Sequence, residues 1–158
     1  MKSPDRWLWL FPPVYFIHLV DERYFGIGTA DFAAQLFDIY FTNTVWWWIN
    51  VPSMLLLTLA TALLVRGTWP AWVAIALAVH LSYHGLGRVP TSLWTSSIAP
   101  GLVSGLLLCT PLALATAVWA RGRFSQPEVL RGLVAGHASF QPFWHLLLLP
   151  ILPEAPGP

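Results

Sequence analysis

Long apolar stretches separated by short polar breaks dominate this chain. Four of them cover about residues 7–28, 45–65, 69–87 and 99–120, and each is close to the ~20 residues that a helix needs to cross ~30 Å of hydrocarbon. The alternation of barrel strands is absent, and a helix satisfies its own backbone in lipid. The pattern therefore predicts an all-α integral membrane protein, in which residues 1–120 form a bundle of about four transmembrane helices.

The remaining segments are more mixed. Residues 24–44 carry two aspartates among apolar side chains, which suits an interfacial segment between the first and second spans. Residues 121–158 begin as a polar, basic linker and end in a short apolar run broken by prolines. We expect this tail, with its histidines His137 and His145, to lie in the membrane interface.

The composition narrows the class of protein. Only 9% of the residues are charged, against about a quarter in an ordinary soluble domain, so the expected surroundings are a lipid bilayer. A net charge of +1 gives no basic footprint for nucleic acid. Cys109 is the only cysteine, which excludes an intrachain disulfide and favours a packing role.

Basic residues predict the orientation, because they gather on the cytoplasmic side. An even number of spans with both termini in the cytoplasm places only Arg23 and Arg88 at the outer side. The residues inside are then Lys2, Arg6, Arg66, Arg121, Arg123 and Arg131. We therefore predict cytoplasmic N and C termini.

Ionisable side chains interrupt two of the apolar spans. In "FIHLVDERYFG", His18, Asp21 and Glu22 fall within one ~100° arc of a helix. In the third span His80 and His84 share a face four residues apart. Ionisable groups at membrane depth are costly and mark candidate functional sites.

The same residues are expected at matching depths. His18 follows Trp7 by 11 residues and His80 follows Trp69 by 11 residues, about 16 Å along a helix. If both tryptophans mark the inner interface, His18 faces His80. Imidazole and carboxylate groups together bind zinc, iron or manganese. The predicted metal ligands are His18, Asp21, Glu22, His80 and His84.

Two classes of function fit this cluster. The first is a membrane enzyme acting on a lipid or isoprenoid-like substrate, in which a metal activates water or oxygen or polarises a substrate oxygen. In its metal-free form His18, Asp21 and Glu22 act as general acid and base. The alternative is a metal or proton carrier, or an accessory subunit, with a structural polar cluster. Arg88 could then neutralise a carboxylate, and Asn50 could reach the cavity or join helices.

Two stretches resemble the HXXEE-domain family of small multi-span membrane proteins. They are "WLWLFPPVYFIHLVDERYF" and "AVHLSYHGLGR…APGLVSGLLLCTPLAL", in the same order as in that family, and the resemblance covers roughly residues 7–120. It implies a multi-span fold with a polar site, and it implies no particular reaction.

The resemblance also assigns individual positions. It implies site roles for His18, Asp21, Glu22 and His80, and structural roles for Pro100 and Gly101. Asp21 stands where the family has glutamate, so the charge is kept and the reach is shorter. His84 is a candidate on spacing alone.

Overall fold

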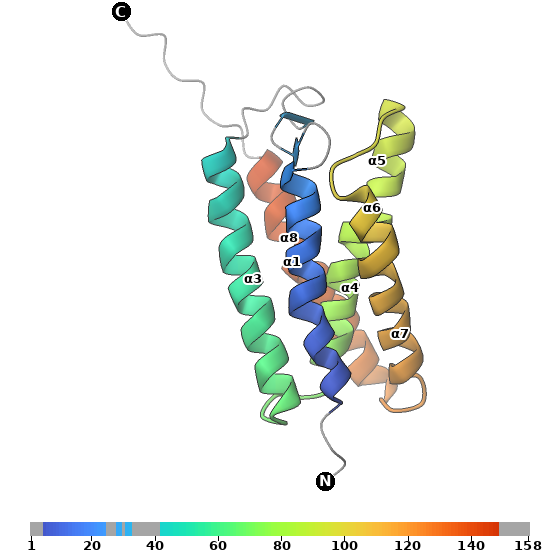
Figure 1. Cartoon of the computed structure of the whole chain (residues 1–158). Helices are drawn as coiled ribbons and strands as arrows, with labels where there is room; N and C mark the ends of the chain where they lie inside the picture. Colours follow the sequence, from blue (N-terminus) through green and yellow to red (C-terminus); the bar gives the residue numbers. More distant parts are fainter. Residues whose placement is uncertain (1–4, 25–27, 30, 33–41, 149–158) are drawn as a thin grey trace, which may run out of the picture.

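The computed structural model describes residues 5–24, 28–29, 31–32 and 42–148, and these residues form helices and turns with no strand among them (Figure 1). The elements in chain order are η1 (Arg6–Leu10), α1 (Phe11–Tyr24), α3 (Asn43–Val65), α4 (Val73–Leu86), α5 (Arg88–Thr95), α6 (Leu102–Ser104), η2 (Gly105–Cys109), α7 (Thr110–Ala120) and α8 (Gln126–Leu148). The helices α1, α3, α4, α7 and α8 lie lengthwise beside one another. The predicted all-α class is confirmed.

Two helices of the described chain are long and apolar enough to cross a membrane. They are Thr44–Val65 and Leu102–Ala120, with mean hydropathies of 1.8 and 1.9. The second is a continuous helix made of α6, η2 and α7, in which η2 is a π-helical segment. Both α1 and α4 have 14 residues, fewer than a span needs by itself. The number of four spans therefore stays a prediction.

A turn delays the start of the third helix. The backbone N–H groups of Thr68 and Trp69 both donate to the carbonyl of Leu63, and Gly67 has φ of 71°, so the chain reverses tightly after α3. Helix α4 begins only at Val73. Trp69, which we used to align the depths of the histidines, therefore lies outside the helix.

Two glycines bring α4 and η2 into close contact. A Cβ on Gly105 would lie 2.6 Å from the carbonyl oxygen of His84 and 2.9 Å from the Cα of Gly85. Small residues allow such close approach of helices in membranes. Because His84 precedes Gly85 and Ser104 precedes Gly105, this contact brings two polar side chains into the centre of the bundle.

The C-terminal helix differs from the expected linker and tail. Residues 126–148 form one 23-residue helix, α8, which runs along α4 from the N-terminal end of the bundle to the opposite end (Figure 1). Its Gly132 and Gly136, four residues apart, pack against Ile75 and Val79 of α4. Pro142, in the apolar part of the expected tail, does not interrupt the helix. The small-residue contact explains why an only partly apolar segment packs there.

Three further predictions concern the segment 24–44, His145 and Cys109. Most of the expected interfacial segment 24–44 lies outside the described residues, as does the side chain of His145. Cys109 is fully buried in the hydrophobic core, which agrees with its expected packing role.

Candidate functional site

A buried polar cluster lies where α1, α4 and α6 meet. His18 and Glu22 are one helical turn apart on α1, with exposed fractions of 0% and 1%, and His84 on α4 is 6% exposed. Buried polar groups of this kind are stable only when they are paired. The cluster contains three of the five predicted ligands.

The donor atoms of these three side chains converge. His18 Nε2 lies 3.1 Å from His84 Nδ1 and 3.4 Å from Glu22 Oε1, and one donor atom of each residue lies within 4.8 Å of the others. Ligands ~2.1 Å from a tetrahedral zinc ion are separated by roughly 3.4 Å. The spacing of the three donors is therefore compatible with a transition metal.

Asp21 contacts the cluster through Ser104 and is not one of the three converging groups. Its Oδ2 accepts hydrogen bonds from the backbone N–H and from the hydroxyl of Ser104, at 2.8 and 2.6 Å. This carboxylate thus faces the first turn of the helix that begins at Leu102, a favourable position for a negative charge. Asp21 lies outside the group of three converging residues, and its role as a metal ligand stays a prediction.

The hydrogen bonds of Ser104 determine which ring nitrogen of His18 carries the hydrogen. The Ser104 hydroxyl gives its hydrogen to Asp21, so its oxygen accepts from His18 Nδ1, 3.0 Å away. In the neutral imidazole, Nε2 then carries the lone pair that faces His84 and Glu22. Metal-binding histidines commonly donate their other N–H in this way, which fixes the ring orientation.

Arg88 compensates the charge of Glu22. The two side chains form an ion pair between Arg88 Nη2 and Glu22 Oε1, with exposed fractions of 14% and 2%. This is the neutralisation considered from the sequence. The pairing offsets part of the cost of burying the Glu22 carboxylate, with or without a metal.

Gly101 makes room for the cluster. Its φ is 77°, and a Cβ there would lie 2.6 Å from both Glu22 Cγ and His18 Cε1. Only glycine combines this backbone conformation with so close an approach. The Pro100–Gly101 pair expected to be structural therefore precedes the helix that begins at Leu102, directly beside the site.

His80 does not meet His18 as predicted. His84 takes that place, and His80 lies one turn away, with its ring 5.0 Å from that of His84. The reason is the late start of α4: counting from Trp69 added about one turn to the expected depth. His80 instead hydrogen-bonds to Ser139 of α8 through Nδ1 at 3.1 Å.

A second polar contact joins α4 to α8. Tyr83 and His137 form a 2.6 Å hydrogen bond through the phenol oxygen and Nδ1. His137, which we expected at the membrane interface, is thus a contact residue between two helices. Tyr15 packs its ring against those of His18, His80 and His84. Asn50 donates to the carbonyl of Trp46 in its own helix at 2.9 Å.

The sequence analysis missed Ser104 and Tyr15. Ser104 was detectable in principle, as a hydroxyl three residues after the Pro-Gly start of an apolar span. Tyr15 lies three residues before His18 and therefore on the same helix face. Both are residue types common in helix packing, so local spacing did not distinguish them.

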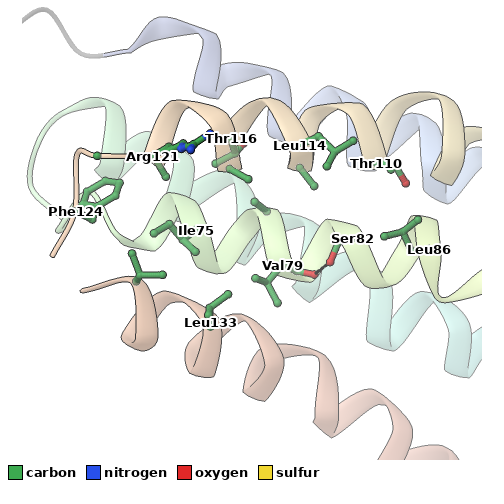
Figure 2. A pocket seen from close by; sticks show the side chains of 16 residues that line it. Ile75, Val79, Ser82, Leu86, Thr110, Leu114, Thr116, Arg121, Phe124 and Leu133 are labelled. Carbon is green, nitrogen blue, oxygen red and sulfur yellow. Dashed lines mark hydrogen bonds between the residues drawn. The ribbon is translucent and has the colours of Figure 1, made fainter. Parts of the chain in front are cut away.

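An apolar cavity of about 460 Å³ lies on another side of α4 (Figure 2). Figure 2 shows Ile75 and Val79 of α4 facing it together with Leu114 of α7 and Leu133 of α8. Its size is that of pockets that bind small organic molecules.

The cavity has two distinct ends. Arg121 and Phe124 line one end, and Leu86 and Thr110 line the other (Figure 2). Thr110 donates to the carbonyl of Gly105 at 3.0 Å. The second end is therefore adjacent to the backbone that carries Ser104 and His84.

Comparisons with known protein families, with curated proteins and with solved structures gave no match.

Proposed function

We propose that the protein is an integral membrane protein whose bundle crosses the bilayer. The support is the apolar exterior of the bundle, since large exposed apolar surfaces are unfavourable in water. Exposed side chains on α1, α3 and α7 include Phe16, Ile17, Leu55, Leu56, Leu59, Leu114 and Val118. We propose an arrangement of four spans. They are formed by η1 with α1, by α3, by α4, and by α6 to α7.

We propose that one end of the bundle faces the cytoplasm. This end contains η1 and the loops 66–72 and 121–125. These segments lie at one end of the bundle (Figure 1), and they hold Arg6, Arg66 and Arg121, as the distribution of basic residues requires. A cytoplasmic C terminus then requires α8 to lie outside the bilayer core.

We propose that the cluster of His18, Glu22 and His84 is a catalytic site that acts on a hydrophobic substrate. The observation that carries this proposal is the convergence of three buried ligand atoms from two helices. His18 Nε2 lies 3.1 Å from His84 Nδ1 and 3.4 Å from Glu22 Oε1. The Asp21–Ser104 pair holds His18 in one tautomer. A purely structural polar contact does not require His18 Nε2 to face both His84 Nδ1 and Glu22 Oε1.

In the metal-dependent form, His18 Nε2, His84 Nδ1 and a Glu22 oxygen would hold a divalent transition metal. Such an ion would act as a Lewis acid toward an oxygen of the substrate or of water. Asp21 and Ser104 would orient His18, and Arg88 would stay paired with Oε1 of Glu22, the oxygen that also lies 3.4 Å from His18 Nε2. Asp21 thus has a positioning role.

In the metal-free form, His18 Nε2 accepts a proton and returns it. The Nδ1–H group keeps its hydrogen bond to the Ser104 oxygen, while Glu22 and His84 lie near enough to share the proton on Nε2. General acid–base catalysis requires groups within this hydrogen-bonding range. Both forms use the same three side chains.

The apolar cavity supports a hydrophobic substrate. Its end at Leu86 and Thr110 lies next to the helices that carry His84 and Ser104, so a chain-like molecule bound there would lie beside the site. We also propose membership of the HXXEE-domain family on the residues quoted above, which implies a multi-span fold with a polar site and no particular reaction.

A second candidate function is proton or metal transfer across the bundle. The observation in its favour is the row of polar side chains from His84 to His80, whose rings lie 5.0 Å apart, and on to Ser139 of α8, which hydrogen-bonds to His80. Proteoliposomes containing the protein should then show proton or zinc flux that His80→Ala abolishes. Without flux, this candidate is excluded.

Elemental analysis and lipid analysis together test the catalytic proposal. The protein purified in mild detergent should hold near-stoichiometric metal, or else cells that express it should show a lipid change that the Glu22→Gln variant does not produce. Leu93→Ala, on an exposed residue of α5, is the control. Absence of metal together with identical lipid profiles for wild type and Glu22→Gln would refute the site.

A further inference from the structure

The apolar cavity of Figure 2 is long in comparison with its width. Its lining extends from Ile75 to Leu86 on α4 and from Thr110 of α7 to Arg121, 11 residues along each side, which is about 16 Å. Over that length, the volume of about 460 Å³ gives a mean cross-section of about 30 Å². Carbon atoms in contact lie about 4 Å apart, so one hydrocarbon chain fits this shape better than a compact molecule does.

The inside of the cavity suits hydrocarbon. Three hydroxyl side chains are among its described lining residues, and each donates its hydrogen to a backbone carbonyl of its own helix. The pairs are Ser82 with Val79 at 2.7 Å, Thr116 with Leu112 at 2.8 Å and Thr110 with Gly105 at 3.0 Å. A polar group of a ligand is costly to bury where these donors are already used. The ligand must therefore be apolar over most of its length.

The two ends of the cavity differ in polarity. Arg121, an exposed residue, lines one end, next to the loop 121–125 at the end of the bundle (Figures 1 and 2). The other end lies at Thr110, near the middle of the helix Leu102–Ala120. A Cβ on Gly85 would already meet the Thr110 hydroxyl there. A polar head group is thus accommodated at the Arg121 end and excluded from the Thr110 end.

The long side of the cavity is open between α7 and α8. Leu114 of α7 and Leu133 of α8 both line the cavity and are exposed. The exposed side chains of Val118 on α7 and Leu130 on α8 continue the apolar surface on either side of this opening. A hydrocarbon chain therefore enters sideways, from apolar surroundings, without passing polar groups.

We infer that the cavity binds a single-tailed amphiphile with one long hydrocarbon chain, whose polar head lies at Arg121 and whose chain end lies at Thr110 and Leu86. The inference rests on the proposed function, which requires a hydrophobic substrate, and it specifies the form and the direction of that molecule. Gly85, at the far end of the cavity, directly follows His84 in the chain. The end of the hydrocarbon chain, and not the head, is thus the part of the ligand nearest to the polar cluster.

Photo-crosslinking of the wild-type protein in a non-ionic detergent tests the direction of the chain. Two fatty acid probes of equal length would carry a diazirine either near the carboxylate or near the chain end. The first should label Ala120 and Phe124, and the second should label Leu86 and Thr110, as located by mass spectrometry. The reverse order, or the same labelled residues with both probes, would overturn the inferred direction.

Two further probes test whether the cavity holds one chain. A photoreactive sterol has fused rings that are wider than a chain, and a diacyl phospholipid has a second tail for which the cavity has no room. Both should label the lining severalfold more weakly than the fatty acid probes do. Equal labelling by either of them would overturn the assignment of a single chain.

Two matched pairs of variants test the location. Ala115 and Ala117 are both exposed on α7, and Ala117 belongs to the described lining whereas Ala115 does not. Leu130 and Leu133 form the equivalent pair on α8, with Leu133 in the lining. Ala117→Phe and Leu133→Trp should fill the cavity and reduce labelling about tenfold, while Ala115→Phe and Leu130→Trp should label like the wild type.

Each pair is decisive by itself, so that a variant that does not fold leaves the other pair as the test. Equal labelling within a pair, whether reduced or unchanged, would overturn the location. Labelling that falls only in Ala117→Phe or only in Leu133→Trp of its own pair supports it.

Glu22→Gln separates this inference from the proposed function. The variant changes the polar cluster, and Glu22 is not among the described lining residues of the cavity, so the probes should label it like the wild type. Loss of labelling in Glu22→Gln would place the probes at the polar cluster and overturn the inference. Unchanged labelling, together with absence of metal and of any lipid change, would refute the catalytic site and leave the cavity as a binding site.

Discussion

His18 Nε2 and His84 Nδ1 lie 3.1 Å apart, although the residues are 66 positions apart in the chain. The contact joins α1 to α4 at the buried centre of the bundle. Two facing imidazole nitrogens need either a shared hydrogen or a cation between them. Substitutions of His84 and Glu22 therefore test whether the site is metal-dependent or metal-free.

The first prediction concerns metal content. If the site holds a metal, His84→Ala should lose most of it, because the variant removes one of the three converging donors, and Glu22→Gln should do the same by removing the charge. His80→Ala is the matched control, since His80 lies one turn away on the same helix and bonds to Ser139. Elemental analysis of the three purified variants measures this. Equal metal loss in His80→Ala and His84→Ala would contradict the assignment.

The site shows what local sequence patterns can and cannot predict. The shared face of His18 and Glu22 was predictable, because i and i+4 positions of one helix are neighbours whatever surrounds them. The choice between His80 and His84 was not, because it depends on where α4 begins, and the turn that delays it to Val73 is made by backbone bonds to Leu63.

Ser104 illustrates the same limit over a longer distance. It lies 86 positions from His18, and its place in the site follows from the close contact of Gly85 with Gly105. The all-α class, by contrast, followed from hydrophobic stretches that each segment carries alone. Properties of single helices were predictable from the sequence, and the register between helices required the structure.

The second prediction concerns Ser104. Ser104→Ala removes the hydroxyl that accepts from His18 Nδ1 and donates to Asp21, so a buried donor loses its partner. We expect a loss of about 1–3 kcal/mol in the free energy of unfolding. Reversible unfolding in mixed micelles measures it, with Ser97→Ala, at an exposed residue, as the control. A Ser104→Ala protein as stable as Ser97→Ala would show that this bond contributes little.

The third prediction concerns topology. A cysteine at Arg123, in a Cys109→Ala background, should react only with reagents that reach the cytoplasm, because the loop lies at the end with the basic residues. A tag placed after residue 148 should be accessible from the other side if α8 crosses the bilayer with α4. Extracytoplasmic labelling at position 123 would contradict the orientation, and a cytoplasmic tag would support the four-span arrangement.

The fourth prediction is a pH effect at the start of α8. The backbone N–H and hydroxyl of Ser125 donate to Glu128 Oε2 at 2.9 and 2.7 Å, and these bonds lower the pKa of Glu128 from its ordinary value of 4.5. Because the folded value is the lower one, the stabilisation is complete above the ordinary pKa and is lost as the pH falls through the folded value.

Hydrogen exchange in the first turn of α8, corrected for the intrinsic rates, should therefore show less protection at acidic pH. Glu128→Gln should remove this pH dependence, since its amide does not titrate. If wild type and Glu128→Gln respond alike to pH, Glu128 is not responsible for the effect.

The last prediction compares two glycines that differ only in their surroundings. Gly101 and Gly122 have φ of 77° and 73°, so an alanine at either position adopts the same unfavourable conformation, at a cost of about 1–2 kcal/mol. No atom lies within 4 Å of a Cβ at Gly122, whereas a Cβ at Gly101 would lie 2.6 Å from Glu22 Cγ and from His18 Cε1. Gly101→Ala must therefore displace the side chains of the site, and overpacking of this kind costs about 1–3 kcal/mol more. Unfolding in mixed micelles should show the difference, and metal content or the lipid change should fall only in Gly101→Ala. Equal stability of the two variants would mean that the site yields to an added methyl group, and that the close approach of Gly101 does not fix the positions of His18 and Glu22.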